Sequence, residues 1–210
     1  MGTVFTNCKY LLKFRTRVKR IWIPPERLQR KKIIMVSASP LRMTVYASLL
    51  ASLIAAGAYL TIPIGPVPIV LQNLFVFLSG LLLGPRWGLA SVGVYLLAGA
   101  LGLPVFAGGV GGIGRFVGPT GGYLVGFIPA VYIIGWITEK LKPRVVFDVV
   151  AMILGSMVIY FFGIAWLKAL TGMTLEKTLI IGMVPFIPGD ILKIAAAVPI
   201  AKALRPIINR

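Results

Sequence analysis

Two charged side chains lie inside an otherwise apolar stretch near the end of the sequence. Asp190 and Lys193 are one helical turn apart and would share one face of a helix. A charge inside a bilayer costs at least ~2.5 kcal/mol on insertion scales, so both groups need partners. We expect the pair to face a pocket and to bind a polar ligand group. The structural alternative is that Asp190 caps the helix after Pro188-Gly189 and Lys193 only pairs with it or reaches toward water.

A second polar patch is rich in glycine and lies between two apolar stretches. Residues 108–122 contain eight glycines in fifteen positions. Glycine accepts a positive φ and lets the backbone approach a ligand closely, so we expect this loop to contact a ligand. No Lys-Ser or Lys-Thr pair follows the glycines, which excludes a nucleotide P-loop. A flexible linker is the alternative, and Gly122 and Gly126 have the spacing of a close helix contact.

Two neutral amides complete the polar set at this end of the molecule. Gln72 and Asn73 lie near the start of an apolar stretch that follows the proline-rich segment 61–68. Their side chains can both donate and accept hydrogen bonds. Non-helical backbone at membrane depth is stable only where protein buries it or where it lines a cavity. The proline-rich segments 61–68 and 184–189 therefore indicate an outward-facing pocket.

The composition indicates a membrane protein. Hydrophobic residues make up 58% of the 210 residues and charged ones 13%, whereas charged residues reach about 25% in soluble domains. Lys and Arg total 22 against 5 Asp and Glu, but eleven of the basic residues lie in the first 42 and most others flank apolar stretches. This is the pattern of cytoplasmic flanks of membrane helices, so we expect a lipid bilayer and no nucleic acid as partner. With no His and one Cys, Cys8, we expect no metal site and no cofactor.

The apolar stretches predict an all-α membrane protein with six transmembrane helices. Crossing the hydrocarbon core takes about 20 apolar residues, fewer where the bilayer thins. The predicted spans are residues 44–60, 69–83, 87–101, 121–138, 145–167 and 184–204. Only Gly84-Pro85-Arg86 separates the second span from the third, which predicts a tight hairpin.

The basic residues predict the orientation. With a cytoplasmic N-terminus, eighteen of the 22 basic residues lie inside, while only Arg115, Lys168 and Lys177 lie outside and Lys193 lies within a span. The positive-inside rule is then satisfied at every cytoplasmic turn, so both termini should be cytoplasmic. The glycine-rich and proline-rich segments then face the outside.

The basic tail, residues 1–42, is expected to be separate from a substrate-binding membrane domain at 43–210. In the tail, Leu11, Phe14, Val18 and Trp22 fall near one helical face, which is compatible with a surface helix on anionic lipid. A tail without such a role, an organelle transit peptide and an upstream start-site error are the alternatives.

Several separated motifs, in order, resemble those of one family. They are Gly65-Pro-Val-Pro-Ile-Val-Leu-Gln72, Gly80-Leu-Leu-Leu-Gly-Pro85, Gly102-Leu-Pro-Val-Phe-Ala-Gly-Gly-Val-Gly-Gly112 and Gly118-Pro-Thr-Gly-Gly-Tyr-Leu124. The sequence is similar to the BioY family, the biotin-binding S-components of energy-coupling factor (ECF) transporters. The likeness covers about residues 44–204 and includes Ile187-Pro-Gly-Asp190.

The resemblance implies a six-helix S-component of the plasma membrane that captures biotin from outside. It implies a ligand site that contains Asp190, Lys193 and the loop at Gly108, Gly109, Gly111 and Gly112, with Tyr123 nearby. It also implies a transmembrane coupling subunit and two cytoplasmic ATPases as partners. This chain has no Walker motif, so it cannot supply the ATP hydrolysis itself. Ala47, Ala51 and Ala55 repeat every four residues and match the small residues that contact the coupling subunit in the family; by sequence alone they are a packing stripe.

The sequence departs from the family pattern at two positions. Some relatives carry a polar residue at the place of Val110 and a basic one directly after the Tyr that matches Tyr123, where this chain has Leu124. Arg115 is a candidate to pair with the biotin carboxylate, because guanidinium groups bind carboxylates bidentately. The alternative for Arg115 is a charged side chain at a loop tip in water, with no role in binding.

The leading hypothesis is therefore a non-enzymatic, biotin-binding membrane subunit for uptake. An S-component for another vitamin would have the same fold. A membrane-embedded enzyme could use Asp190 and Lys193 as acid and base, but the sequence offers it no His. A passive channel would need a polar stripe through several spans, which the inner halves lack.

Overall fold

The structure is a computed structural model that describes residues 25–62, 67–141 and 144–208, with side chains from residue 40 onward. The chain divides into two compact units, residues 1–40 and residues 41–210, and the predicted membrane spans all lie in the second. The surface helix predicted at residues 11–22 lies outside the described residues.

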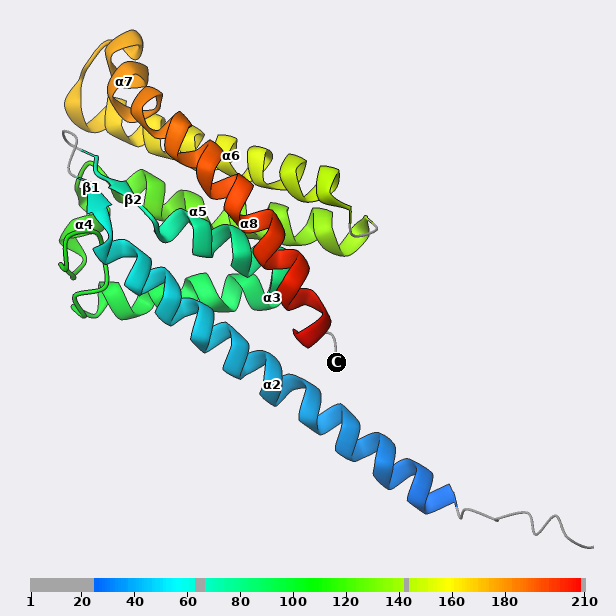
Figure 1. The fold of residues 1–210 in the computed structure, drawn as a ribbon. Coiled ribbons are helices and arrows are strands. Elements are labelled where there is room, and N and C mark those ends of the chain that lie inside the picture. The colour runs from blue at the N-terminus through cyan, green and yellow to red at the C-terminus, as the bar shows by residue number, and fades with distance from the viewer. Residues whose placement is uncertain (1–24, 63–66, 142–143, 209–210) are drawn as a thin grey trace, which may run out of the picture. The chain divides into compact units, whose positions relative to one another are not determined.

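The described part of the chain is almost entirely helical (Figure 1). Its elements are α2 (Pro25–Tyr59), β1 (Thr61–Ile62), β2 (Ile69–Val70), α3 (Gln72–Ala100), α4 (Gly114–Val117), α5 (Gly121–Lys140), α6 (Val145–Thr171), α7 (Leu175–Gly182), the 3₁₀ turn η1 (Val184–Phe186) and α8 (Ile187–Ile208).

Five helical stretches of the described residues are long and apolar enough to cross a membrane. They are Pro40–Tyr59, Gln72–Ala100, Gly121–Lys140, Val145–Thr171 and Leu175–Ile208. The structure thus agrees with a multi-pass helical protein, but the count differs from the predicted six. The difference arises because the predicted second and third spans belong to one element, α3.

A sharp bend at Gly84 divides α3 into two arms. Gly84 has φ 73° and ψ −172°, a region of backbone conformation that is essentially restricted to glycine. The hydroxyl of Tyr95 donates a hydrogen bond of 3.0 Å to the side-chain oxygen of Gln72. Along a straight helix these two residues would be about 35 Å apart. The arms at 72–83 and 85–100 therefore fold back on each other, and the tight hairpin predicted at this place is present.

Prolines shape the approaches to the second and last predicted spans. Helix α3 begins at Gln72 and helix α8 at Ile187, although the apolar helical stretch that contains α8 extends back to Leu175. Ile69–Val70 pairs with Thr61–Ile62 in a short antiparallel ladder, and the helix begins only at Gln72. Val184–Phe186 forms a 3₁₀ turn before α8 begins at Ile187. A proline supplies no backbone N–H and fixes φ, which favours turns and short ladders over a continued helix.

Helix α5 lies between α3 and α6 and packs closely on both (Figure 1). A Cβ added at Gly122 would come within 2.3 Å of the Trp166 Cβ, and one at Gly126 within 3.1 Å of the Ile159 Cα. The close helix packing expected of these two glycines is therefore confirmed. Small residues at such crossings let helices approach in a bilayer, where the hydrophobic effect gives no driving force between them.

The alanine stripe of α2 also packs inside the chain. Ala47 and Ala51 are 4% and 6% exposed, and Ala55 is half-buried against the core. The stripe therefore does not form an open surface of the described residues. The exposed face beside it carries Ser48, Ser52 and Ala56.

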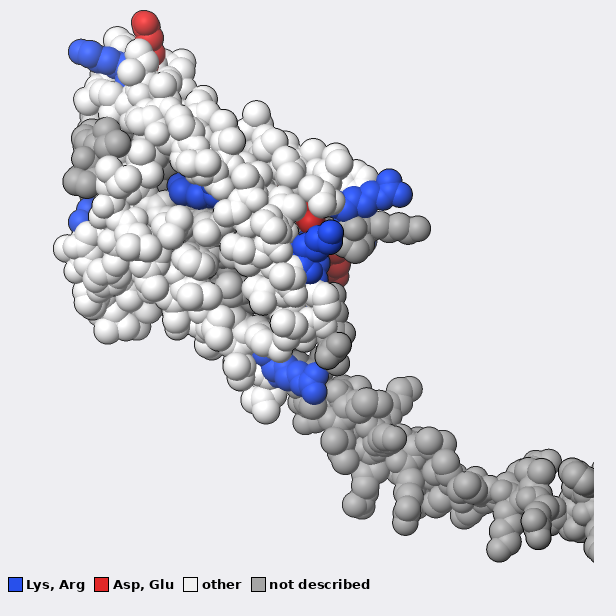
Figure 2. Space-filling view, in the orientation of Figure 1, with Lys and Arg blue, Asp and Glu red and all other residues white. Residues whose placement is uncertain are grey.

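Charged residues gather toward the two ends of residues 41–210, and the surface between them is mostly uncharged in the view of Figure 2. Large apolar side chains such as Phe161 and Leu192 are 70% and 72% exposed. Exposure of this kind fits a belt that faces lipid, because an apolar surface there needs no cover from water.

The bend at Gly84 should be intolerant of any side chain. We expect Gly84→Ala to lower the free energy of unfolding by about 1–3 kcal/mol, because a non-glycine residue is strained at this φ and ψ. Thermal unfolding of the detergent-purified protein measures the loss. Gly93→Ala is the control, since a Cβ at Gly93 meets nothing within 4 Å. Equal unfolding temperatures for the two variants would contradict the assigned role of Gly84.

Candidate functional site

A pocket lies at the end of the bundle where β1, β2 and α4 are found (Figure 1). Its empty volume is about 600 Å³, including its mouth. Its walls are mostly apolar, with a few polar side chains between them, which is the usual make-up of a small-molecule site. It is lined by Val67, Pro68, Val70, Gln72, Asn73, Phe106, Ala107, Arg115, Thr120, Tyr123, Leu124, Phe127, Ile159, Tyr160, Phe186 and Lys193.

A three-residue network holds the charge at this pocket. The Lys193 ammonium donates to Oδ1 of Asp190 at 2.9 Å, and the Tyr160 hydroxyl donates to Oδ2 at 2.5 Å. Asp190 and Lys193 are each 6% exposed. Since both carboxylate oxygens accept a hydrogen bond, the buried negative charge is compensated within the protein.

The network has a pocket side and an outer side. Lys193 and Tyr160 line the pocket, whereas Asp190 lines a groove between α6 and α8. An ammonium has three donors, and Lys193 gives one of them to Asp190. The groups offered to a ligand are therefore the two remaining N–H donors of Lys193 and the oxygen of Tyr160, and Asp190 lies behind them.

The two amides predicted for the site do line the pocket. Gln72 is 4% exposed, and its carbonyl oxygen accepts the hydrogen bond from the Tyr95 hydroxyl. That bond assigns the oxygen of Gln72 to Tyr95 and leaves the NH₂ group for the pocket. Asn73, the next residue of α3, lines the same wall.

Arg115 and Tyr123 also reach the pocket. Arg115, in the short helix α4, donates a hydrogen bond of 3.4 Å to the Ala107 carbonyl and lines the pocket mouth. The hydroxyl of Tyr123 donates to the carbonyl of Gly182 at 2.8 Å. Tyr123 thereby ties the pocket wall on α5 to the end of α7.

The four glycines expected to contact a ligand are not among the lining residues. Gly108, Gly109 and Gly112 have φ values of 81°, 69° and 98°, which glycine adopts without strain. A Cβ at Gly111 would come within 2.2 Å of the Leu103 carbonyl oxygen. In this structure the glycines give the loop its shape.

The folded loop presents its own aromatic residue to the pocket. The N–H of Phe106 donates to the carbonyl of Val110 at 2.9 Å, and the Phe106 ring is 2% exposed. That ring meets Tyr95 and Phe116 edge to face, with centroids 5.5 and 5.6 Å apart. The loop thus supplies Phe106 and Ala107 to the pocket wall.

Tyr160 is the member of the charged network that the sequence analysis missed. It lies in the apolar run of α6, where a tyrosine gives no sign of its partner. One signal was available in the sequence. A carboxylate inside the membrane, such as that of Asp190, needs a second hydrogen-bond donor besides Lys193. Phe127, Ile159 and Phe186 were likewise not singled out, because apolar pocket walls and ordinary core positions look the same in sequence.

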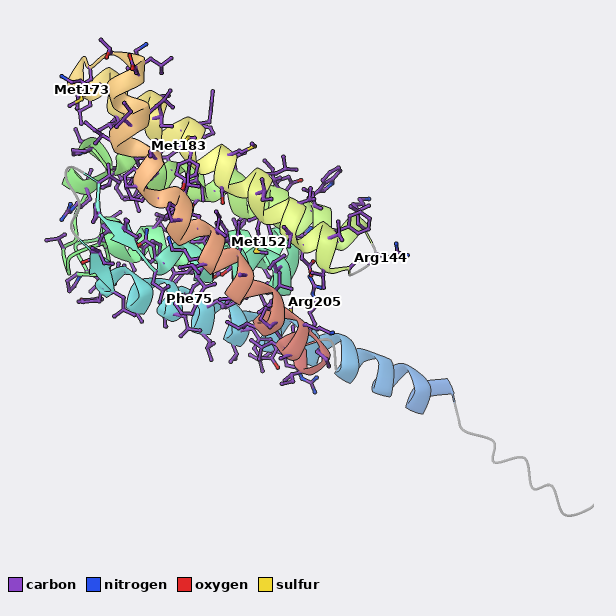
Figure 3. The ribbon with its side chains drawn as sticks, turned by 45° about the horizontal axis from the view of Figure 1, so that its top comes forward. Phe75, Arg144, Met152, Met173, Met183 and Arg205 are labelled. Carbon is purple, nitrogen blue, oxygen red and sulfur yellow. The ribbon has the colours of Figure 1, made fainter. Side chains whose placement is uncertain are left out.

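A second ion pair, between the half-buried Arg205 and the buried Asp148, lies at the opposite end of the bundle, where Figure 3 labels Arg205. Its guanidinium donates to both oxygens of Asp148, at 2.7 and 2.8 Å. The same group lies 3.5 Å from the carbonyl oxygen of Leu81. Leu81 lies in the last turn before the bend at Gly84, and Pro85 after the bend has no N–H to donate. Arg205 therefore joins α8 to the start of α6 and to the bend of α3.

The described residues contain no group of three or more His, Cys, Asp and Glu side chains that could hold a metal ion. The polar groups of the pocket are cations, amides and hydroxyls, with Arg115 and Lys193 as its charged members. Such a set suits a ligand with hydrogen-bonding and anionic groups.

Taken together, the fold and the pocket define a multi-pass membrane protein that binds a small, mainly apolar ligand at one end of its helices. The comparisons with known proteins agree. The BioY family model matches residues 29–210, and the chain belongs to the BioY family.

Two similar proteins carry the name of this family. The chain is 43% identical to a probable biotin transporter BioY of Pyrococcus horikoshii, over 75% of this chain and 93% of that one. It is 41% identical to the biotin transporter BioY of Thermotoga maritima, over 79% and 96% of the two chains. The crystal structure of the S-component for biotin from an ECF-type ABC transporter aligns with a TM-score of 0.76 at 35% identity, covering 80% of this chain and 92% of that one.

The network predicts non-additive effects on stability. We expect Asp190→Asn to cost several kcal/mol, because it leaves the buried Lys193 without a counter-charge. Asp190→Asn combined with Lys193→Met should cost less than Asp190→Asn alone, since no unpaired charge remains. The measurement is thermal unfolding of ligand-free protein, with the exposed Lys168→Met as control. Simple addition of the two single effects would show that the ion pair is not energetically coupled.

Proposed function

We propose that this chain is a high-affinity biotin-binding membrane subunit, an S-component, that mediates uptake of biotin. The observation that carries the proposal is the pocket in which a buried, charge-compensated Lys193 and Tyr160 stand among apolar walls, in a chain of the BioY family. The relatives in this family are transporters rather than enzymes. Asp190 and Lys193 accordingly serve binding and not acid-base catalysis.

The chemistry of biotin matches the polar groups of the pocket. Biotin has an apolar bicyclic body and chain, a neutral ureido group and one carboxylate. We assign the ureido carbonyl to donors of the Lys193 ammonium and the Gln72 amide, and a ureido N–H to the oxygen of Tyr160. We assign the carboxylate to Arg115 at the pocket mouth. Phe106 and Phe127 provide apolar walls for the ring system.

The remaining site residues have a supporting part in this proposal. Asn73 and Tyr123 line the pocket and can reach a ligand, whereas Asp190 acts by holding the Lys193 side chain in place. The glycines at 108, 109, 111 and 112 determine the conformation of the loop that carries Phe106. We also propose that the backbone of these glycines contacts the ligand.

For the topology, we propose six crossings with both termini in the cytoplasm of a plasma-membrane protein. The two arms of α3 then count as separate crossings, which is supported by their antiparallel arrangement about Gly84. The cations Arg86, Lys140 and Arg205 lie at the end of the bundle away from the pocket. By the positive-inside rule that end faces the cytoplasm, and biotin enters from outside.

For energy coupling, we propose a transmembrane coupling subunit and two cytoplasmic ATPases as partners. The support is the ECF-type context of the related S-component and the absence of a nucleotide motif in this sequence. On α2, Ala47 and Ala51 are buried. We therefore assign the contact with the coupling subunit to Ala55 and the exposed Ser48, Ser52 and Ala56.

Calorimetric titration of the purified chain tests the function. Biotin should bind tightly, and desthiobiotin, which keeps the ureido group and the carboxylate, should bind more weakly. Thiamine and riboflavin should not bind. Absence of biotin binding to well-folded protein would overturn the proposal, and tight binding of another vitamin would assign the chain to an S-component for that vitamin.

The same titration tests the site. We expect Lys193→Met and Tyr160→Phe to weaken biotin binding at least tenfold each, which corresponds to about 1.4 kcal/mol, a typical value for a hydrogen bond to a charged group. Arg115→Gln should weaken biotin while leaving the methyl ester of biotin unaffected, because only the acid form pairs with Arg115. Lys177→Met, at an exposed position, is the matched control. Unchanged affinities in Lys193→Met and Tyr160→Phe would remove this site.

A further inference from the structure

A hollow of about 1340 Å³, including its open mouth, lies at the end of the bundle away from the biotin pocket. It is bordered by the bend of α3, the last turn of α5 and the end of α8. The proposed function makes no use of it. Its lining differs from that of the biotin pocket, because charged residues stand at its rim and leucines at its wall.

The described residues that line the hollow carry more positive than negative charge. Arg205 is neutralised by Asp148, with which it shares two hydrogen bonds. Arg86 and Lys140 are exposed, and neither makes an ion pair with any residue that the structure describes. Glu139 is the one acid among the described residues of the lining. Two unpaired cations against one carboxylate leave the hollow positive.

The other wall of the hollow is apolar. Leu82, Leu83, Met43 and Trp87 contribute to it, and Trp87 lies directly beside Arg86. A tryptophan next to a basic residue at the end of a membrane helix is typical of the level of the lipid headgroups. The lining therefore combines cations with hydrocarbon-compatible surface at the depth where a phospholipid changes from headgroup to acyl chain.

We propose that this hollow binds the headgroup of an anionic phospholipid, with its phosphodiester between Arg86 and Lys140 and its upper acyl chain along Leu82, Leu83 and Trp87. Basic pockets between membrane helices bind anionic lipid headgroups in this way. The bound lipid would join α3 to α5 at the Gly84 bend, the point at which α3 depends on backbone that only glycine adopts. Binding at this place is independent of biotin.

Native mass spectrometry of the full chain in equal amounts of phosphatidylglycerol and phosphatidylcholine with the same acyl chains tests the site. We expect retained lipid to be mainly phosphatidylglycerol. Arg86→Gln and Lys140→Gln should each reduce that preference about fivefold, the effect of one charge near a lipid surface. Glu139→Gln should increase it, because a repulsive carboxylate is removed.

The control variant is Arg144→Gln, which removes an exposed cation at the same end of the bundle but outside the hollow. Its lipid preference should equal that of the unchanged protein. An equal loss in Arg144→Gln would show general surface attraction and overturn the proposal, as would no loss in Arg86→Gln and Lys140→Gln. Displacement of the lipid by soluble glycerol 3-phosphate at similar concentration would show a site for free phosphate rather than for a lipid. Biotin affinity should be the same in all four variants, which separates this test from that of the proposed function.

Discussion

The structure depends on how a very apolar chain compensates its few buried charges. Asp190 pairs with Lys193 near the pocket, and Asp148 pairs with Arg205 at the other end. A single unpaired charge at these positions would cost several kcal/mol. The Asp148–Arg205 pair therefore requires α6 and α8 to be correctly placed, whereas Asp190 and Lys193 pair within α8. The first pair joins α6 and α8 through Tyr160, and the second joins the same two helices to α3. These polar contacts thus link helices that otherwise meet through apolar surfaces.

The compensation also explains what the pocket offers to a ligand. Because Asp190 is satisfied by two donors from the protein, it does not need the ligand to be stable. The Lys193 ammonium lies in an apolar setting, with donors left for a neutral carbonyl. A site of this kind binds an uncharged polar group strongly without opening to bulk water, since the charge is already balanced before the ligand arrives. This is the requirement for a ligand such as biotin, whose body is apolar and whose head is polar but neutral.

The sequence predicted the class of fold well, and several of the polar residues that it singled out line one pocket, but it predicted the geometry less well. Hydropathy and the distribution of basic residues indicate a multi-pass helical protein, and the Gly84-Pro85 pair indicated the hairpin. Helices α3 and α8 begin after Ile69 and Val184, because apolar residues continue into turns that prolines impose. Tyr160 was missed since its partner is thirty residues away in sequence. Burial of Ala47 and Ala51 could not be foreseen, because a small-residue stripe serves an internal and an external contact equally well.

The most direct test of the central claim is a structure of the purified chain with biotin bound. We predict density for the ureido ring within hydrogen-bond distance of Lys193 and Tyr160, with Asp190 still paired to both residues. The valerate chain should run toward Arg115 at the mouth of the pocket. Biotin bound elsewhere, or bound with Asp190 released from Tyr160 and directly contacting the ligand, would contradict the claim that Asp190 acts only through its two partners.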